Sequence, residues 1–275
     1  MNTLSLSTWI FSHLPLKEMV AKVARSGYSN VELSGKNWGE FVWDRQELAD
    51  EFAKYGIRIL SVHCHHHAAL GKNAGFKDYC EFQEKFYSMM KPFGKIIVVE
   101  HAPNPGMELA KCFPEQVKFA SELCDKYGFT CAYENLPRSL QGKPEDFNGF
   151  FDDKNDTVKF TFDAAHAAYA DIDPLLFSGH FKHLANVHVY DVHDKLKLGD
   201  WLPAGMGKMD WPAILKSLRQ SGYTGPLTIE LCSDNTRELL RILKAAGAVT
   251  ETGTGLECAF AIHARELIEG MLAGL

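Results

Sequence analysis

The sequence predicts a single (β/α)8 barrel, an α/β fold in which eight parallel strands close on themselves. Its 275 residues suit one barrel, a fold of about 250 residues. Eight short β-rich runs alternate with stretches of helical spacing, in units of roughly 30 residues. No GxGxxG or Walker pattern follows the first run, which removes the usual support for an open nucleotide-binding sheet. We therefore expect one domain over residues 1–275.

The predicted strands are TLSLST from Thr3, NVELS from Asn30, IRILSVH from Ile57, KIIVVEH from Lys95, FTCAYEN from Phe129, VKFTFD from Val158, LANVHVYD from Leu184 and PLTIEL from Pro226. Helical spacing marks LKEMVAKVARSG, RQELADEFAKYG, FKDYCEFQEKFYSMMKPFG and PEQVKFASELCDKYG between the earlier strands. Glycine is the usual left-handed helix stop, and we expect it at Gly27, Gly56, Gly94, Gly128 and Gly222.

Two further helices are predicted after the eighth strand, at 234–247 and from Gly255 onward. Residues 250–275 would form a C-terminal helical extension. The helix in this extension is either the eighth outer helix of the barrel or packs on a second subunit in a homodimer or homotetramer. The linker between the two helices, AVTETGTG, is polar and rich in glycine.

Composition narrows the class of function. The formal net charge is -6 and no cluster of Lys or Arg stands out, so we expect a small-molecule substrate and no nucleic acid. The N-terminal segment lacks a signal-peptide pattern and no window approaches about 18 uninterrupted apolar residues, which predicts a cytoplasmic protein with no membrane partner. Seven cysteines without a CxxC pair are expected to be reduced and mostly buried.

Ionisable residues stand at the ends of the predicted strands. All strands of a parallel barrel deliver their C-terminal ends to one face, so these side chains should converge. They are Glu32, His63, Glu100 with His101, Glu134, Asp163, His188 with Asp191, and Glu230. Three carboxylates and one imidazole, from Glu134, Asp163, His188 and Glu230, suit one divalent cation such as Mn²⁺, Mg²⁺, Co²⁺ or Zn²⁺. Taken singly, each could instead form an ordinary salt bridge at the rim.

The segments AYENLP, TFDAAH, NVHVYD and PLTIEL, with PAGMGKMDWPAILKSLRQSGYTGP before the last, resemble the xylose isomerase-like TIM barrel superfamily. That superfamily includes sugar phosphate isomerases and epimerases and AP endonuclease family 2. The resemblance implies that the four residues are metal ligands and that His166 contacts substrate or a second metal. In the family's sugar epimerases two metal-bound glutamates exchange protons with carbon, and Glu134 and Glu230 match them.

The resemblance thus implies a divalent-metal-dependent isomerase or epimerase. It would act on a small sugar or polyol-type carbonyl compound by proton transfer through an enediolate. Ketose 3-epimerases of the family carry a second glutamate six residues after the first metal glutamate, and an arginine six after the metal histidine. This chain has Leu140 and Asp194 there, which argues against a free-sugar ketose 3-epimerase.

Two other activities stay open. The family's apurinic endonucleases hold three zinc ions, and many of their ligand positions match His63, His101, Glu134, Asp163, His166, His188 and Glu230. Their Asp-x-His pair corresponds at best to Asp200-Trp201-Leu202, so the third zinc would lack a ligand. A dehydratase acting on an inosose or a dehydroshikimate-like compound would share the C–H abstraction and add an acid, for which His101, His166 and Lys208 are candidates. The same three residues are also expected as contacts with the substrate. A non-enzymatic sensor is a further alternative, in which the four predicted metal ligands would bind no metal.

Other residues are weaker candidates for substrate contacts. Of the run His63 to His67 we expect only His63 in the site and the later histidines in a solvated loop. Glu32 is expected either to bind a substrate hydroxyl or to pair with a neighbouring strand end. Trp9, and after it Trp201, could cover the apolar face of a sugar. Lys208 could contact a phosphate or carboxylate group of the substrate. Asp210 is expected to cap a helix.

Overall fold

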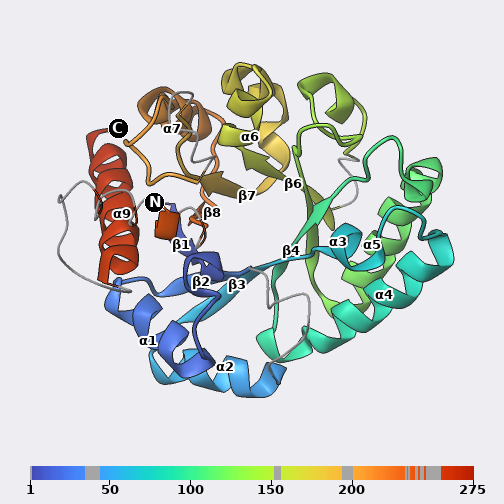
Figure 1. Cartoon of the computed structure of the whole chain (residues 1–275). Coiled ribbons are helices and arrows are strands. Elements are labelled where there is room, and N and C mark those ends of the chain that lie inside the picture. The colour runs from blue at the N-terminus through green and yellow to red at the C-terminus, as the bar shows by residue number, and fades with distance from the viewer. Residues whose placement is uncertain are drawn as a thin grey trace.

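The computed structural model describes residues 2–34, 44–151, 156–193, 201–232, 234, 236–238, 241, 245 and 255–275. Eight parallel strands form a closed barrel in chain order, and helices surround it (Figure 1). The strands are β1 Thr3–Ser7, β2 Asn30–Leu33, β3 Arg58–His63, β4 Ile97–His101, β5 Thr130–Glu134, β6 Val158–Asp163, β7 Leu184–Val189 and β8 Pro226–Ile229. All eight predicted strands and the barrel are confirmed.

The α-helices are α1 Leu16–Arg25, α2 Arg45–Lys54, α3 His66–Leu70, α4 Phe76–Met89, α5 Phe113–Tyr127, α6 Ala164–Tyr169, α7 Trp211–Gln220 and α9 Gly255–Gly274. Short 3-10 turns are η1 Thr8–Phe11, η2 Lys91–Phe93, η3 Glu108–Cys112, η4 Pro144–Phe147 and η5 Pro174–His183. All five glycines predicted as helix stops have φ between 68° and 78°. Gly128 ends α5 in the left-handed conformation, whereas Gly94, with ψ of -144°, does not adopt it. Asp210 caps α7 by accepting a hydrogen bond from the Ala213 backbone N–H at 3.1 Å.

The C-terminal helix α9 packs on the barrel itself, against α1, α7 and β8 (Figure 1). The Tyr28 hydroxyl, just before β2, donates a hydrogen bond to the Ala261 carbonyl oxygen in α9 at 2.9 Å. The predicted extension thus belongs to the ring of outer helices. The helix predicted at 234–247 lies mostly outside the described residues. Within the ranges that the structure describes, no helix is long and apolar enough to cross a membrane.

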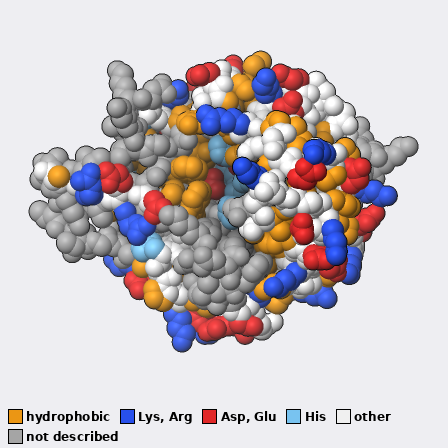
Figure 2. All heavy atoms as spheres, turned by 45° about the vertical axis from the view of Figure 1, so that its right-hand side comes forward, with side chains coloured by type: hydrophobic (Ala, Val, Ile, Leu, Met, Phe, Trp, Pro, Cys, Tyr) orange, Lys and Arg blue, Asp and Glu red, His pale blue; other side chains and the backbone are white. Residues whose placement is uncertain are grey.

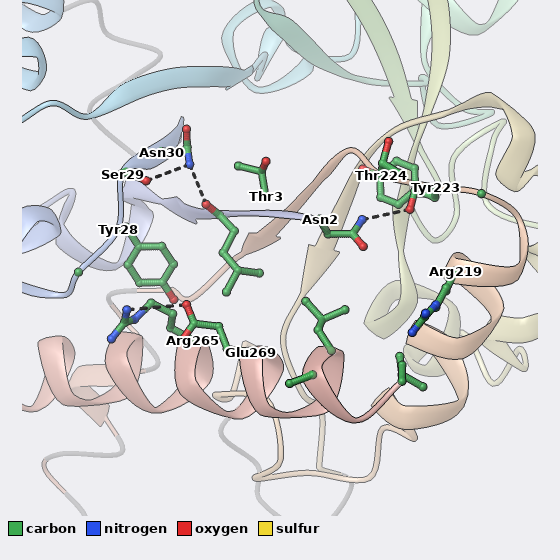
Figure 3. A pocket seen from close by; sticks show the side chains of 16 residues that line it. Asn2, Thr3, Tyr28, Ser29, Asn30, Arg219, Tyr223, Thr224, Arg265 and Glu269 are labelled. Carbon is green, nitrogen blue, oxygen red and sulfur yellow. Dashed lines mark hydrogen bonds and ion pairs between the residues drawn. The ribbon is translucent and has the colours of Figure 1, made fainter.

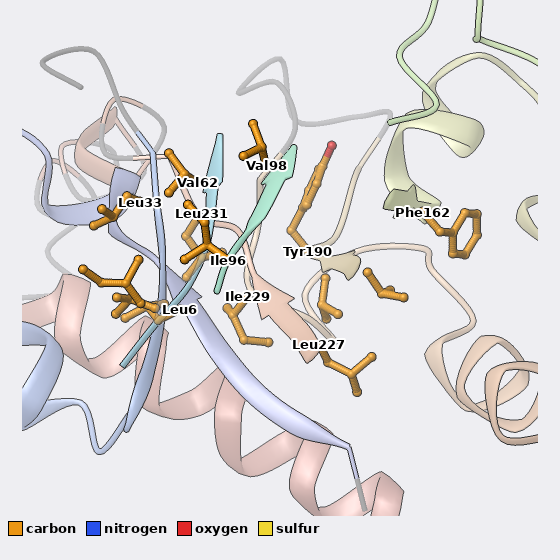
Figure 4. Close-up of a cluster of buried hydrophobic side chains, with 14 of the residues drawn as sticks. Leu6, Leu33, Val62, Ile96, Val98, Phe162, Tyr190, Leu227, Ile229 and Leu231 are labelled. Atoms are coloured by element: carbon orange, nitrogen blue, oxygen red, sulfur yellow. The ribbon is translucent and has the colours of Figure 1, made fainter. Parts of the chain in front are cut away.

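Alternation along the strands separates an apolar outer face from a polar interior. Leu6, Leu227 and Ile229 lie in the hydrophobic core (Figure 4). Helix residues such as Val20 belong to the same core. The alternate positions carry small polar side chains that bond to one another inside the barrel. Thr228 donates to Asn186, and Asn186 donates to Glu32, both at 2.9 Å. Because β2 and β7 are not neighbours, this second bond crosses the interior.

Candidate active site

The four predicted metal ligands meet at the C-terminal end of the barrel. Glu134 and Asp163 end β5 and β6, His188 lies near the end of β7, and Glu230 follows β8. All four are buried, and one ligand atom from each lies within 4.8 Å of the others. The His188 Nδ1 atom lies 2.8 Å from Glu134 Oε1, 3.5 Å from Glu230 Oε2 and 3.7 Å from Asp163 Oδ2. The imidazole therefore presents Nδ1 to all three carboxylates.

The other ring nitrogen of His188 faces Glu32. Its Nε2 atom is 3.2 Å from Glu32 Oε1. Glu32 Oε2 accepts hydrogen bonds from Ser61 at 2.8 Å and Asn186 at 2.9 Å, residues that precede His63 and His188 by two positions on their strands. Glu32 thus lies between His188 on one side and Ser61 and Asn186 on the other, and its carboxylate faces the Nε2 atom of His188. The hydrogen bond from Ser61 joins Glu32 to the neighbouring strand β3. Pairing with a neighbouring strand is one of the two alternatives predicted for Glu32.

The histidines predicted to bind substrate border the same cluster. His101 Nε2 lies 2.7 Å from Glu134 Oε2 and 2.8 Å from His63 Nε2, so His63, His101 and Glu134 form a second possible ligand group that shares Glu134. His166 Nδ1 lies 3.4 Å from both Glu134 Oε1 and Asp163 Oδ2. The structure therefore brings all three predicted histidines to the site.

The electrostatics of the cluster favour a bound cation. Burial disfavours a charged His188, yet the carboxylates of Glu230, Glu32 and Glu134 raise its pKa well above the ordinary value. Burial opposes ionisation of Glu134, but His188 and His166 hold its pKa well below its ordinary value. Asp163 Oδ2 is buried and makes no hydrogen bond to another described residue. Oxygen-rich donors and a buried carboxylate oxygen without a hydrogen bond fit a divalent ion.

Aromatic side chains flank the approach to the cluster. Figure 2 shows histidine side chains in a hollow near the centre of one face, with hydrophobic side chains beside them. Trp9, in η1, contacts Trp201 edge to face with ring centroids 5.1 Å apart, and Trp201 stacks on Tyr190 at 5.8 Å. Tyr190 in turn contacts His166 at 6.3 Å. Lys208 is exposed and stands outside the buried cluster.

The prediction of a solvated loop after His63 is wrong for His66. His66 is 1% exposed, and its Nδ1 atom lies 3.0 Å from Glu100 Oε2. His65 is half-buried and stacks on His63 with centroids 4.6 Å apart. The chain enters α3 at His66, which turns this side chain inward toward α4. The His67 side chain lies outside the described residues.

Asp191 organises the loop after β7. Its carboxylate accepts hydrogen bonds from the backbone N–H groups of Gly205 at 2.8 Å and Met209 at 2.9 Å. A Cβ atom on Gly207 would lie 2.3 Å from Asp191 Oδ1, so only glycine fits there. This strand-end carboxylate is therefore architectural. Asp194 and Asp200 lie outside the described residues, and Leu202 is buried and pairs with Asp191 in an antiparallel bridge.

A separate cavity of about 840 Å³ lies at the other end of the barrel (Figure 3). It is bordered by α9 and by the N-terminal ends of β1 and β2, including Asn2, Tyr28 and Arg265. Asn2 donates to the carbonyl oxygens of Tyr223 and Gly225 there. Among the described residues no cluster of three or more possible metal ligands lines this cavity. In this fold the N-terminal face contributes stability and the C-terminal face chemistry.

Known proteins resemble this chain in sequence or in fold. The rhizopine catabolism protein MocC of Rhizobium meliloti is 22% identical over 251 residues, which cover 80% of this chain and 75% of MocC. An L-ribulose 3-epimerase structure superposes with TM-score 0.72 at 19% identity, covering 100% of this chain and 95% of the other. An AP endonuclease, family 2, from Brucella melitensis superposes with TM-score 0.68 at 16% identity, covering 88% and 99%. At these identities the superpositions establish the fold alone.

The model of one protein family matches most of the sequence. Its description is xylose isomerase-like TIM barrel, and the match spans residues 20–252. That range contains the four converging ligands and the histidines beside them. The chain belongs to the xylose isomerase-like TIM barrel family.

Proposed function

We propose that the protein is a divalent-metal-dependent isomerase or epimerase acting on a small sugar or polyol-type carbonyl compound. The observation that carries this proposal is the placement of Glu134 and Glu230. They reach one buried cluster from β5 and from the end of β8, three strands apart, and both approach His188 Nδ1. Two carboxylates on different sides of this cluster can exchange protons with the two faces of a substrate bound between them.

The donor set would hold Mn²⁺, Mg²⁺, Co²⁺ or Zn²⁺ through Glu134, Asp163, His188 and Glu230. Such an ion supplies Lewis-acid polarisation of the substrate carbonyl, which acidifies the adjacent C–H bond. One glutamate then takes the proton from carbon, giving an enediolate. The other glutamate returns a proton to the opposite face for epimerisation, or to the neighbouring carbon for isomerisation. In isomerisation the proton of the adjoining hydroxyl also moves to the former carbonyl oxygen, so that the carbonyl group changes position. A positioned carboxylate contributes about 10²–10⁴-fold to such a step.

The neighbouring side chains have supporting roles in this proposal. The short contact of His101 Nε2 with Glu134 Oε2, at 2.7 Å, holds that carboxylate in one orientation. His63 and His166 are within reach of substrate oxygens beside Glu134 and Asp163. Trp9 and Trp201 would cover the apolar face of the substrate ring, and they would exclude water from the site.

The apurinic endonuclease is the second candidate. The group formed by His63, His101 and Glu134 favours it, because it offers ligands for a further metal next to the first. Against it, the buried apolar Leu202 stands where the third zinc of those enzymes needs a histidine. The dehydratase would use the same base, and release of water would identify it.

Solvent-deuterium exchange tests the proposal. The metal-loaded protein is incubated in D₂O with ketoses, aldoses and inososes, and mass spectrometry follows deuterium at carbon. We expect exchange with at least one compound, and a loss of about 100-fold or more in both Glu134→Gln and Glu230→Gln. Glu115→Gln, at an exposed glutamate of α5, is the control and should keep full activity.

Three outcomes would count against the proposal. Exchange that persists in both glutamine variants would remove the two glutamates from the chemistry. Incision of abasic-site DNA by the wild type, lost in a His101→Ala variant, would instead assign the endonuclease activity. A product lighter by one water molecule would assign the dehydratase.

A further inference from the structure

A second cluster of ligand-type side chains lies behind the site, on the outer face of β3 and β4. Cys64 follows β3, His66 opens α3, Glu100 lies in β4 and Gln83 comes from α4. All four are buried, with exposed fractions of 0% or 1%. Neighbours along a strand point to opposite faces, so Cys64 and Glu100 lie back to back with the site residues His63 and His101.

We propose that Cys64, His66, Glu100 and Gln83 bind a zinc ion, as a structural site independent of the proposed function. The first three residues place a thiol sulfur, an imidazole nitrogen and a carboxylate oxygen within 4.8 Å of one another. Sulfur, nitrogen and oxygen from these residue types are the ligands of protein zinc sites. No such sulfur is among the ligands proposed for the active site.

Two distances from the Cys64 sulfur match those around tetrahedral zinc, and the distance from the His66 nitrogen to the Glu100 oxygen is shorter. Bonds of about 2.3 Å to sulfur and about 2.0–2.2 Å to nitrogen and oxygen place S and N about 3.6 Å apart, S and O about 3.6 Å apart, and N and O about 3.4 Å apart. Cys64 Sγ lies 3.7 Å from His66 Nδ1 and 3.6 Å from Gln83 Oε1. His66 Nδ1 lies 3.0 Å from Glu100 Oε2, a few tenths of an ångström closer than expected. Small side-chain shifts would admit the ion.

Charge balance supports the same ion. A thiolate and a carboxylate together neutralise Zn²⁺, so the filled site carries no net charge into the interior, where a net charge would be costly. Binding would release the Cys64 thiol proton to solvent and form the sulfur–zinc bond. Surrounding groups already orient the carboxylate: Gln83 Nε2 donates to Glu100 at 3.0 Å and the Tyr87 hydroxyl donates at 3.2 Å.

The position of this site gives it a role. It would join the end of β3, the start of α3 and the end of β4. Those two strand ends also carry His63 and His101, whose Nε2 atoms lie 2.8 Å apart in the active site. Zinc on the outer face would therefore fix the positions of the two histidines relative to each other. The proposal does not depend on what reaction the front of the barrel performs.

Cobalt substitution tests the site. Cells are grown with cobalt in place of zinc, so that the buried site can form around the ion, and the absorption spectrum of the intact protein is recorded. A thiolate ligand gives a sulfur-to-cobalt charge-transfer band in the near ultraviolet, which nitrogen and oxygen ligands do not. We expect this band in the wild type and in Glu230→Gln, together with loss of the band and of one metal equivalent in Cys64→Ser.

Two further cysteine variants serve as controls. Cys131→Ser, at a buried cysteine of β5 outside the cluster, should keep the band. Cys232→Ser tests the buried cysteine near Glu230 and should also keep it. If Cys64→Ser does not fold, His66→Gln replaces it, and the band should shift or disappear. Cobalt-bound wild type without the band, or a band that depends on Cys232 and not on Cys64, would overturn the proposal.

Discussion

Glu32→Gln isolates the contribution of the carboxylate behind His188. Glu32 Oε1 lies 3.2 Å from His188 Nε2, so an Nε2–H group facing this carboxylate leaves Nδ1 free for the cation. Glutamine keeps the size of the side chain and its contacts with Ser61 and Asn186, but removes the charge. Loss of such a supporting partner typically weakens metal affinity by about 10- to 100-fold. That range corresponds to about 1.4–2.7 kcal/mol.

Metal affinity is measured by calorimetry or by competition with a chelating dye, using Mn²⁺, on samples whose circular dichroism matches the wild type. Glu51→Gln is the matched control, because Glu51 is a buried glutamate on the outer helix α2, and its affinity should be unchanged. Asp163→Asn should weaken binding more than Glu32→Gln does. Wild-type affinity in Glu32→Gln would refute the orienting role. Abolished binding in Glu32→Gln with binding spared in Asp163→Asn would place the ion on Glu32 instead.

Three further predictions concern stability. Burial raises the pKa of Glu257 from an ordinary 4.5 to about 7, so the folded protein keeps the carboxyl proton at pH values where the unfolded chain has lost it. The resulting stabilisation of the folded state is fully present below pH 4.5 and is lost as the pH rises through 7. Glu257→Gln should therefore be more stable than wild type at pH 8, by up to about 3 kcal/mol, with little difference at pH 4.5, as urea unfolding would show. Gly207→Ala should destabilise by about 1–3 kcal/mol, because its Cβ would overlap Asp191, whereas Gly270→Ala in α9 meets no atom within 4 Å and should be neutral or stabilising. Mn²⁺ at 100 times its dissociation constant should stabilise the wild type by about 2.7 kcal/mol, and a chelator or Glu230→Gln should remove that gain in thermal unfolding.

Barrel topology explains why much of the site could be predicted. Glu134, Asp163, His188 and Glu230 are far apart in sequence, but each stands at the end of a β-rich run. Once eight parallel strands close, those ends must share one face. The glycine stops were predictable for a similar local reason, since a left-handed residue at a helix end favours glycine in any sequence.

Features that depend on packing could not be predicted in this way. A register shift between Val31 and Glu32 sets Glu32 opposite Ser61, and this shift leaves no mark in the sequence pattern. His66 comes shortly after the end of a predicted strand, so the sequence pattern favoured a loop position for it. Its partner Glu100 and the neighbouring Gln83 come from other elements, and their meeting depends on how α3 and α4 pack. The sequence offered one sign of this outer cluster: Glu100 directly precedes the site histidine His101, so its side chain must point to the opposite face of the strand.

The central claim is that one divalent ion binds between Glu134, Asp163, His188 and Glu230. Anomalous diffraction from crystals grown with Mn²⁺ tests it most directly, because the map shows the position of the ion without any assumption about substrate. The account predicts a peak in bonding contact with a carboxylate oxygen of each acidic residue and with His188 Nδ1. A peak held only by His63 and His101, or no peak among the four residues, would contradict it.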